Sequence, residues 1–175
     1  MNVQSKAGET AAALPPASPA IERIGVVGAG QMGNGISHVC ALAGLPVVLL
    51  DARKEALDKA MAAMAHNMDR QVNRDLISPL EKAEALARVT PTIDYAAFGD
   101  CDLVIEAATE KEEIKRAIYQ TLTPHLKPGC MIASNTSSIS ITRLGASTDR
   151  PGKFIGMHFM NPVPVMKLVE LRSEE

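Results

Sequence analysis

The sequence has few cysteines, no excess of basic residues and no long apolar run, and each absence excludes a class of protein. Its three cysteines, Cys40, Cys101 and Cys130, are odd in number and lie far apart in apolar or turn contexts. Such cysteines are typical of buried thiols in a reducing compartment rather than of a disulfide framework. We therefore expect a cytoplasmic protein.

Charge and hydropathy argue against two kinds of partner. The 175 residues carry a formal net charge of -2, whereas a nucleic acid or an anionic membrane surface is bound by a strongly basic field. No apolar run approaches the length of a membrane-spanning helix, and the sequence has no internal repeat. We predict no nucleic-acid partner, no membrane partner and no metal site.

The first 20 residues differ in composition from the rest. Residues 1–20 are rich in Ala, Pro and small polar residues, and they lack the apolar core of a signal peptide and the arginines of a mitochondrial presequence. This composition predicts a disordered tail. A chain of 175 residues buries roughly two thirds of the surface that its unfolded form exposes, enough for one full core. We therefore predict one folded domain over residues 21–175.

From Ile21 onward strands and helices alternate, as in a doubly wound α/β sheet. Short apolar runs predict strands at 24–27, 46–50, 103–105, 130–134 and 154–158. Residues 52–90 carry few strand formers and predict a helical hairpin, with one helix over 53–73 and a second that ends near Arg88. The second helix begins at Ser78-Pro79-Leu80-Glu81, a capping box with proline at the first helical position.

The first predicted strand runs into a glycine-rich turn, Gly28-Ala29-Gly30-Gln31-Met32-Gly33, which opens a helix. In such a turn the first glycine permits a tight bend, the second lets the backbone approach a pyrophosphate, and the third lets the helix pack closely on the sheet. The N-terminus of the helix then faces the anion. This context predicts binding of a dinucleotide rather than a packing role for the glycines.

Asp51 supports this prediction and indicates whether the dinucleotide is NAD or NADP. It follows Gly33 by eighteen residues at the end of the second predicted strand, where a carboxylate can bind both ribose hydroxyls of the adenosine. The same carboxylate would repel the 2′-phosphate of NADP, which favours NAD as cofactor. Arg53 is close enough in sequence to moderate this preference.

Charged residues follow the strand at 103–105. Ligands of a doubly wound sheet bind beyond the carboxyl ends of its strands. A helix is predicted over 111–122. Glu110 directly precedes this helix and Lys115 lies within it, so both are candidate cofactor contacts. A second interpretation explains them equally well, because a glutamate suits a helix N-terminus electrostatically and a lysine can simply be solvated.

Two further segments converge on this edge of the sheet. The cluster Ser134-Asn135-Thr136-Ser137-Ser138 suits a polar substrate, although such clusters also cap helices, as Ser140 could for the segment through Leu144. His158 ends the next strand, and Glu170 follows it by twelve residues. A titratable ring and a carboxylate are the parts of a general base and its orienting partner. A lone histidine is more often structural, but the convergence of strand ends on one crevice favours catalysis.

These motifs together resemble the NAD-binding domain of the 3-hydroxyacyl-CoA dehydrogenases, and most closely that of bacterial 3-hydroxybutyryl-CoA dehydrogenases. The resemblance rests on the glycine turn, Ile105-Glu106-Ala107-Ala108, the hydroxyl cluster and the segment from His158 to Glu170, and it covers about Ile21 to Leu171. It implies a Rossmann-like, doubly wound, mostly parallel sheet with an inserted helical hairpin. The implied reaction is the reversible, NAD-dependent oxidation of an (S)-3-hydroxyacyl-CoA to the 3-oxoacyl-CoA, as in the β-oxidation of fatty acids.

The resemblance also implies a role for each motif residue. His158 would act as general base on the 3-hydroxyl group, Glu170 would orient the ring and stabilise its protonated form, and Ser137 would hydrogen-bond the reacting oxygen. The implied cofactor contacts are Gly28, Gly30, Gln31, Met32, Gly33, Asp51, Glu110, Lys115, Ser137 and Asn161. Asn67 and Arg74 are spaced to share a helix face and match CoA-contacting positions loosely, although such residues are as often merely solvated.

Members of this family continue beyond the glutamate into a helical domain, which supplies another catalytic asparagine, covers the acyl pocket and forms most of the dimer interface. The present sequence stops at Glu175, with no asparagine after Glu170. We therefore expect an exposed apolar surface that favours self-association or a complementing C-terminal domain. Two functions stay open: a dehydrogenase, or an NAD-binding module with little or no turnover unless complemented. A dehydrogenase for another hydroxy acid is disfavoured by the specificity of the last motif.

Overall fold

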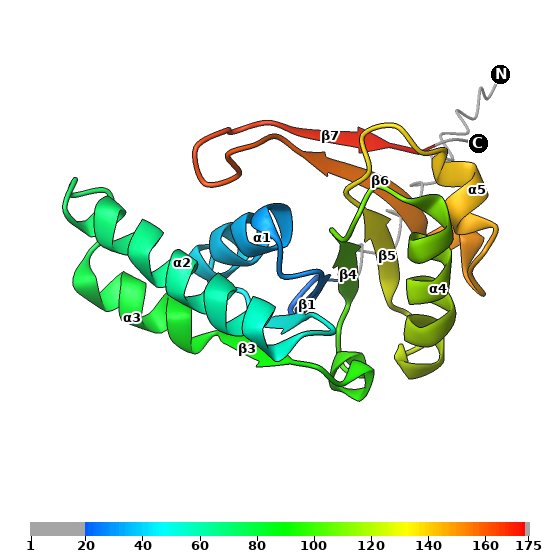
Figure 1. Ribbon diagram of the computed structural model, residues 1–175, viewed down its shortest axis with the longest axis horizontal. Helices are drawn as coiled ribbons and strands as arrows, with labels where there is room; N and C mark the ends of the chain where they lie inside the picture. Colours follow the sequence, from blue (N-terminus) through cyan, green and yellow to red (C-terminus); the bar gives the residue numbers. More distant parts are fainter. Residues whose placement is uncertain (1–19, 174–175) are drawn as a thin grey trace, which may run out of the picture.

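The strand that leads into the glycine turn lies inside a seven-stranded sheet in the computed structural model, which describes residues 20–173 (Figure 1). The strands are β1 (Ile24–Val27), β2 (Val47–Leu50), β3 (Val89–Thr92), β4 (Leu103–Glu106), β5 (Met131–Ser134), β6 (Phe154–Phe159) and β7 (Val169–Arg172). Their order is β3-β2-β1-β4-β5-β6-β7, and all neighbours are parallel except β6 and β7. The tail predicted for residues 1–20 lies, except for its last residue, outside the described residues.

Helices cover both faces of the sheet (Figure 1). They are α1 (Gln31–Leu42), α2 (Lys54–Val72), α3 (Pro79–Ala87), α4 (Glu112–Leu122) and α5 (Ile141–Gly145). Side chains of alternate strand residues divide the core: Val26 and Leu49 pack with α1, α2 and α3, whereas Val27 and Leu50 pack with α4 and α5. Each fully buried aliphatic side chain contributes about 1.5–3 kcal/mol to stability. Burial on both faces explains why these strands are continuous apolar runs in the sequence.

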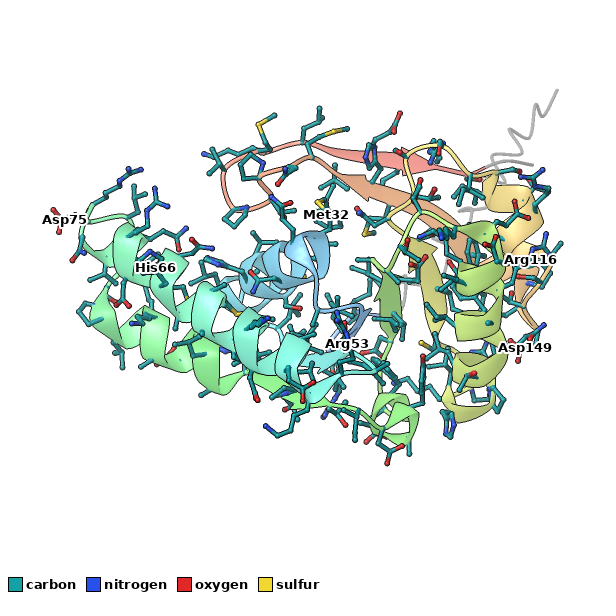
Figure 2. All side chains as sticks on the ribbon, viewed as in Figure 1. Met32, Arg53, His66, Asp75, Arg116 and Asp149 are labelled. Carbon is teal, nitrogen blue, oxygen red and sulfur yellow. The ribbon has the colours of Figure 1, made fainter. Side chains whose placement is uncertain are left out.

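The α2–α3 hairpin confirms the helices predicted for residues 52–90. The hydroxyl of Ser78 accepts a hydrogen bond from the backbone N–H of Glu81 at 3.1 Å, and the carboxylate of Glu81 accepts one from the N–H of Ser78 at 2.6 Å. The hairpin projects beyond the edge of the sheet, with Asp75 in the turn at its far end (Figure 2). Because α2 ends at Val72, Arg74 lies in that turn and not on the helix face predicted for it.

Two strands were absent from the prediction. β3 forms within a segment that contains Pro91, which a strand tolerates here because β3 is at the edge of the sheet and pairs only with β2. β7 is short and largely exposed, so its residues show no apolar run of their own. Antiparallel pairing with β6 stabilises β7 and places its side chains beside those of β6.

The remaining predicted elements agree with the structure to within a few residues at their ends. Lys111 occupies the N-cap position of α4 without a capping hydrogen bond from its side chain. The hydroxyl of Ser140 accepts a hydrogen bond from the backbone N–H of Arg143 at the start of α5. The three cysteines are buried and unpaired, as predicted. Among the described residues, no helix has the length and apolar character needed to cross a bilayer.

Candidate cofactor and catalytic site

Strand order reverses between β1 and β4, and the candidate site lies beyond the carboxyl ends of these strands. Three adjoining pockets occupy this edge, and two of them contain the predicted cofactor and catalytic residues. The glycine pocket is lined by Gly28, Ala29, Gly30, Gln31, Met32, Asp51, Arg53, Glu55, Ala56, Lys59, Ala107, Ala108 and Thr109. The histidine pocket is lined by Met32, Ala107, Ala108, Glu110, Lys115, Asn135, Ser137, His158, Phe159, Met160 and Asn161. Met32, at the start of α1 (Figure 2), belongs to both, so one elongated ligand can span them.

The glycine turn fits a dinucleotide. Gly28 has φ +102°, and a Cβ there would lie 2.9 Å from the carbonyl oxygen of Ala107. A Cβ on Gly33 would lie 1.7 Å from the carbonyl oxygen of Gly28, so only glycine lets α1 approach the turn this closely. Around Gly30, by contrast, a Cβ would meet no atom within 4 Å, and no side chain caps the first N–H groups of α1. An open backbone with uncapped N–H groups is the usual receptor for a pyrophosphate.

The carboxylate of Asp51 is held in place at the end of β2. One oxygen accepts a hydrogen bond from the N–H of Ala29 at 2.9 Å, and the other accepts one from the N–H of Arg53 at 3.0 Å. The Arg53 side chain is 78% exposed, and its Nε lies 4.0 Å from Oδ1 of Asp51. Such an exposed, long ion pair leaves most of the negative charge of Asp51 uncompensated.

Glu110 connects the loop before α4 to the hydroxyl cluster after β5. Its Oε1 accepts hydrogen bonds from the hydroxyl of Thr136 at 2.5 Å and from the N–H groups of Ser137 at 3.0 Å and Ser138 at 3.3 Å. Burial raises the pKa of Glu110, but these hydrogen bonds and the charge of Lys115 outweigh burial and hold the pKa below its usual value. The carboxylate therefore binds the hydroxyl cluster rather than the N-terminus of α4.

Lys115 is buried, contrary to the interpretation that it is solvated. Its side chain is 1% exposed, and its Nζ lies 2.8 Å from each carboxylate oxygen of Glu106. The same Nζ lies 3.7 Å from Oε2 of Glu110. Lys115 thus joins one fully buried carboxylate to another that faces the histidine pocket.

His158 and Glu170 face each other across β6 and β7. They are paired in the antiparallel register, and Nδ1 of the ring lies 3.3 Å from Oε2 of the carboxylate. Because an ionised carboxylate only accepts hydrogen bonds, Nδ1 of the neutral ring carries the proton, and Nε2 keeps its lone pair. Asn135 fixes the end of β6, since its Oδ1 accepts a hydrogen bond from the N–H of Phe159 at 2.8 Å.

The remaining predicted site residues fall into two groups. Ser137 and Asn161 line the histidine pocket with His158, and the side-chain amide of Gln31 donates to Oδ1 of Asn161 at 3.1 Å. Asn67 and Arg74 are not in that pocket. Both line a groove between α2 and the segment after β6. Asn67 also lines a pocket that includes Gly30 and Asn161. The contact of Asn67 and Arg74 with substrate stays a prediction.

Sequence reasoning missed several residues that hold the site together. Glu106 was noted only as part of a motif, although a charged residue that ends an apolar strand and precedes a lysine by nine residues was a usable signal. Asn135 and Tyr119 gave no such signal, because their partners depend on the pairing of β5 with its neighbours and on the packing of α4. Arg172 donates to the carbonyl oxygen of Thr136 at 2.6 Å, a contact that depends on the unpredicted strand β7.

The strand order, the glycine turn at the switch point and the carboxylate after β2 define a dinucleotide-binding domain of the Rossmann type. Comparison with known families agrees: residues 23–175 match the family described as 3-hydroxyacyl-CoA dehydrogenase, NAD binding domain. The chain belongs to this family, whose cofactor is NAD.

Three proteins that are similar to this chain have names that agree with this family. The chain is 55% identical over 151 residues to a 3-hydroxybutyryl-CoA dehydrogenase of Bradyrhizobium diazoefficiens, an alignment that covers 86% of this chain and 52% of that protein. A fatty acid oxidation complex subunit alpha of Psychrobacter cryohalolentis is 42% identical over 156 residues, covering 89% of this chain and 22% of that protein. The crystal structure of (S)-3-hydroxybutyryl-CoA dehydrogenase from Ralstonia eutropha superposes with a TM-score of 0.85 at 47% identity, covering 87% of this chain and 54% of the other. The chain thus spans about half the length of the two 3-hydroxybutyryl-CoA dehydrogenases.

Proposed function

We propose that this chain is the cofactor-binding and base-supplying part of an NAD-dependent 3-hydroxyacyl-CoA dehydrogenase, with (S)-3-hydroxybutyryl-CoA as the favoured substrate. The observation that carries the proposal is the pair His158–Glu170, in which the His158 ring lines the histidine pocket beside the glycine turn and the Glu170 carboxylate lies behind that ring. Kinship with proteins named 3-hydroxybutyryl-CoA dehydrogenase supports the choice of substrate.

In the proposed reaction the 3-hydroxyl group of the substrate loses its proton to Nε2 of His158. Nδ1 of the ring donates to Glu170 throughout, so the carboxylate orients the ring and stabilises the imidazolium that forms. Ser137 lines the same pocket and would hydrogen-bond the reacting oxygen while the C3–O bond becomes a carbonyl. In the reverse direction the imidazolium returns its proton to that oxygen.

The residues that would hold the cofactor are those of the two pockets. The N–H groups at the start of α1 would bind the pyrophosphate, and Asp51 would bind the adenosine ribose. Glu110, Lys115 and Asn161 would contact the nicotinamide half. When bound, NAD supplies the acceptor for the hydride that leaves C3.

A second function is favoured by the apolar surface beside the catalytic pair. Val165, Leu168 and Leu171 are 70%, 56% and 61% exposed, and they lie on β7 and on the segment that leads to it. Apolar groups this close together commonly mark an interface. In this second function the chain binds NAD but turns over only when a second copy or a helical domain covers that surface.

We place the protein in the cytoplasm. Burial raises the pKa of the thiol of Cys40, of Cys101 and of Cys130 to about 11 in each case. Thiols of this kind are packing groups, and their unpaired state supports a reducing compartment.

Acetoacetyl-CoA and NADH test the proposal. The absorbance of NADH should fall when this chain, at high concentration, is mixed with both compounds, and NADH binding should be measurable without the thioester. Binding without oxidation supports the second function, and a chain that neither binds nor oxidises NADH contradicts both.

A further inference from the structure

A buried carboxylate that the proposed mechanism does not use accepts five hydrogen bonds. Glu106, at the end of β4, is 0% exposed. Its Oε1 accepts from Nζ of Lys115 at 2.8 Å and from the N–H of Ala108 at 2.7 Å. Its Oε2 accepts from the same Nζ, from the hydroxyl of Tyr119 and from the hydroxyl of Ser134, each at 2.8 Å.

The four donor residues come from three neighbouring parts of the site. Ser134 ends β5, directly beside Glu106 in the parallel register, and the hydroxyl cluster follows it. Ala108 belongs to the loop between β4 and α4, which lines both pockets. Lys115 and Tyr119 are one turn apart on the buried face of α4. The carboxylate therefore joins the central strands to α4 and to the loop that faces the cofactor.

Lys115 is the residue through which this arrangement reaches the cofactor. Of the residues that line the histidine pocket, it is the only lysine or arginine. A buried ammonium group needs a counter-ion, and Glu106 supplies it with both oxygens. Without that counter-ion the nearest carboxylate is that of Glu110, whose Oε2 lies 3.7 Å from Nζ and whose Oε1 accepts from Thr136, Ser137 and Ser138.

We propose that Glu106 is a positioning residue for the cofactor site, one that holds the ammonium group of Lys115 in the geometry that receives the nicotinamide half of NAD. The inference rests on the proposed NAD-dependent function and deepens it. It differs from a purely structural role, because it predicts that the effect of Glu106 on cofactor affinity passes through the ammonium group of Lys115.

Two measurements on the full chain test the proposal. The first is the NADH dissociation constant, which Glu106→Gln should raise by roughly tenfold or more, the effect of losing one charge-assisted hydrogen bond. The second is acetylation of lysines by a water-soluble reagent, followed by mass spectrometry without cofactor. Lys115 should be protected in the wild type and labelled in Glu106→Gln.

Matched variants separate positioning from stability. Tyr119→Phe removes one donor from Glu106 but leaves its pairing with Lys115 intact, and it should keep NADH affinity within about twofold and Lys115 protected. In a Lys115→Met background, Glu106→Gln should change NADH affinity no further, and this double variant also removes the unpaired buried charge. If Glu106→Gln does not fold, Glu106→Asp retains the charge, withdraws it by one methylene and should show the same two effects.

Three results would overturn the proposal. The first is a Glu106→Gln variant that binds NADH as tightly as the wild type and in which Lys115 stays protected from acetylation. The same result in Glu106→Asp counts if Glu106→Gln does not fold. The second is an equal loss of affinity in the Lys115→Met background, since Glu106 would then act by another route. The third is a wild-type chain that binds no NADH, which contradicts the proposed function as well. Binding of NADH without turnover contradicts only the dehydrogenase activity and leaves the role of Glu106 standing.

Discussion

His158 and Glu170 are direct cross-strand partners in the antiparallel pair β6–β7, with Nδ1 of the ring 3.3 Å from Oε2 of the carboxylate. Glu170 follows His158 by twelve positions in the sequence, and the register of the two strands brings them together. Because side chains alternate between the faces of a strand, a slip of one residue would turn Glu170 to the opposite face. The geometry of the candidate base thus depends on the pairing of β7.

Removing the charge of Glu170 should reduce turnover more than cofactor binding. Glu170→Gln keeps the size of the side chain but stabilises the imidazolium less, so we expect turnover about ten- to a hundredfold lower. The carboxylate lines neither the glycine pocket nor the histidine pocket, so the NADH dissociation constant should change little. Steady-state rates with acetoacetyl-CoA and a fluorescence titration with NADH measure the two effects. Unchanged turnover would assign Glu170 to strand pairing alone.

Two glycines of the same turn should respond differently to alanine. In Gly33→Ala the new methyl group would lie 1.7 Å from the carbonyl oxygen of Gly28, so α1 must move and stability should fall by roughly 1–3 kcal/mol. In Gly30→Ala the methyl group meets no protein atom within 4 Å and occupies the space assigned to the pyrophosphate. This variant should keep its melting temperature but bind NADH more weakly. Equal NADH affinity in Gly30→Ala and the wild type would contradict the assigned pyrophosphate position.

Asp102 should make the stability of the fold depend on pH in the acid range. A hydrogen bond from Lys127, with further hydrogen bonds from the N–H groups of Glu22 and Arg23, lowers the pKa of Asp102 to about 2. Because the folded pKa lies below the usual value of 3.8, the carboxylate stabilises the fold fully above pH 4, and this contribution is lost as pH falls toward 2. Urea denaturation at several pH values measures the loss. Asp102→Asn should show a smaller decrease over that range, and an identical pH profile would exclude this cause.

The three thiols should be unreactive in the folded protein. Burial raises the pKa of each to about 11, so little thiolate exists at pH 8, and the side chains are also shielded from reagents. Iodoacetamide should label Cys40, Cys101 and Cys130 in denaturant only. Rapid labelling of one thiol in the native protein would show that its part of the core opens locally.

Most of the fold was predictable because local patterns and tertiary structure agree. The apolar strand before Gly28 and the capping box at Ser78 are read from neighbouring residues alone, and the structure contains both. β7 was not predictable in the same way, since Val169 and Leu171 are exposed and the strand exists through its pairing with β6. The strand depends on β6, which is a separate segment of the sequence, so the residues of β7 alone show no periodic apolar pattern that predicts a strand.

The candidate site was predictable where its residues follow a strand, and less so where they depend on packing. Asp51 and His158 each follow from strand ends that meet at one edge of a parallel sheet. The burial of Lys115 and the five hydrogen bonds of Glu106 follow from how α4 packs on β4 and β5, which no short motif encodes. A lysine on an amphipathic helix is ordinarily solvated, so only the structure distinguishes this one.

The His158→Ala variant tests the central claim most directly. Turnover of NADH with acetoacetyl-CoA and the dissociation constant of NADH should be measured on the same preparations of variant and wild type. We predict that turnover disappears while the NADH dissociation constant stays within about twofold of the wild-type value, because the ring supplies the base and the glycine pocket supplies most of the binding. Retained turnover in His158→Ala would contradict the account and assign the histidine to structure.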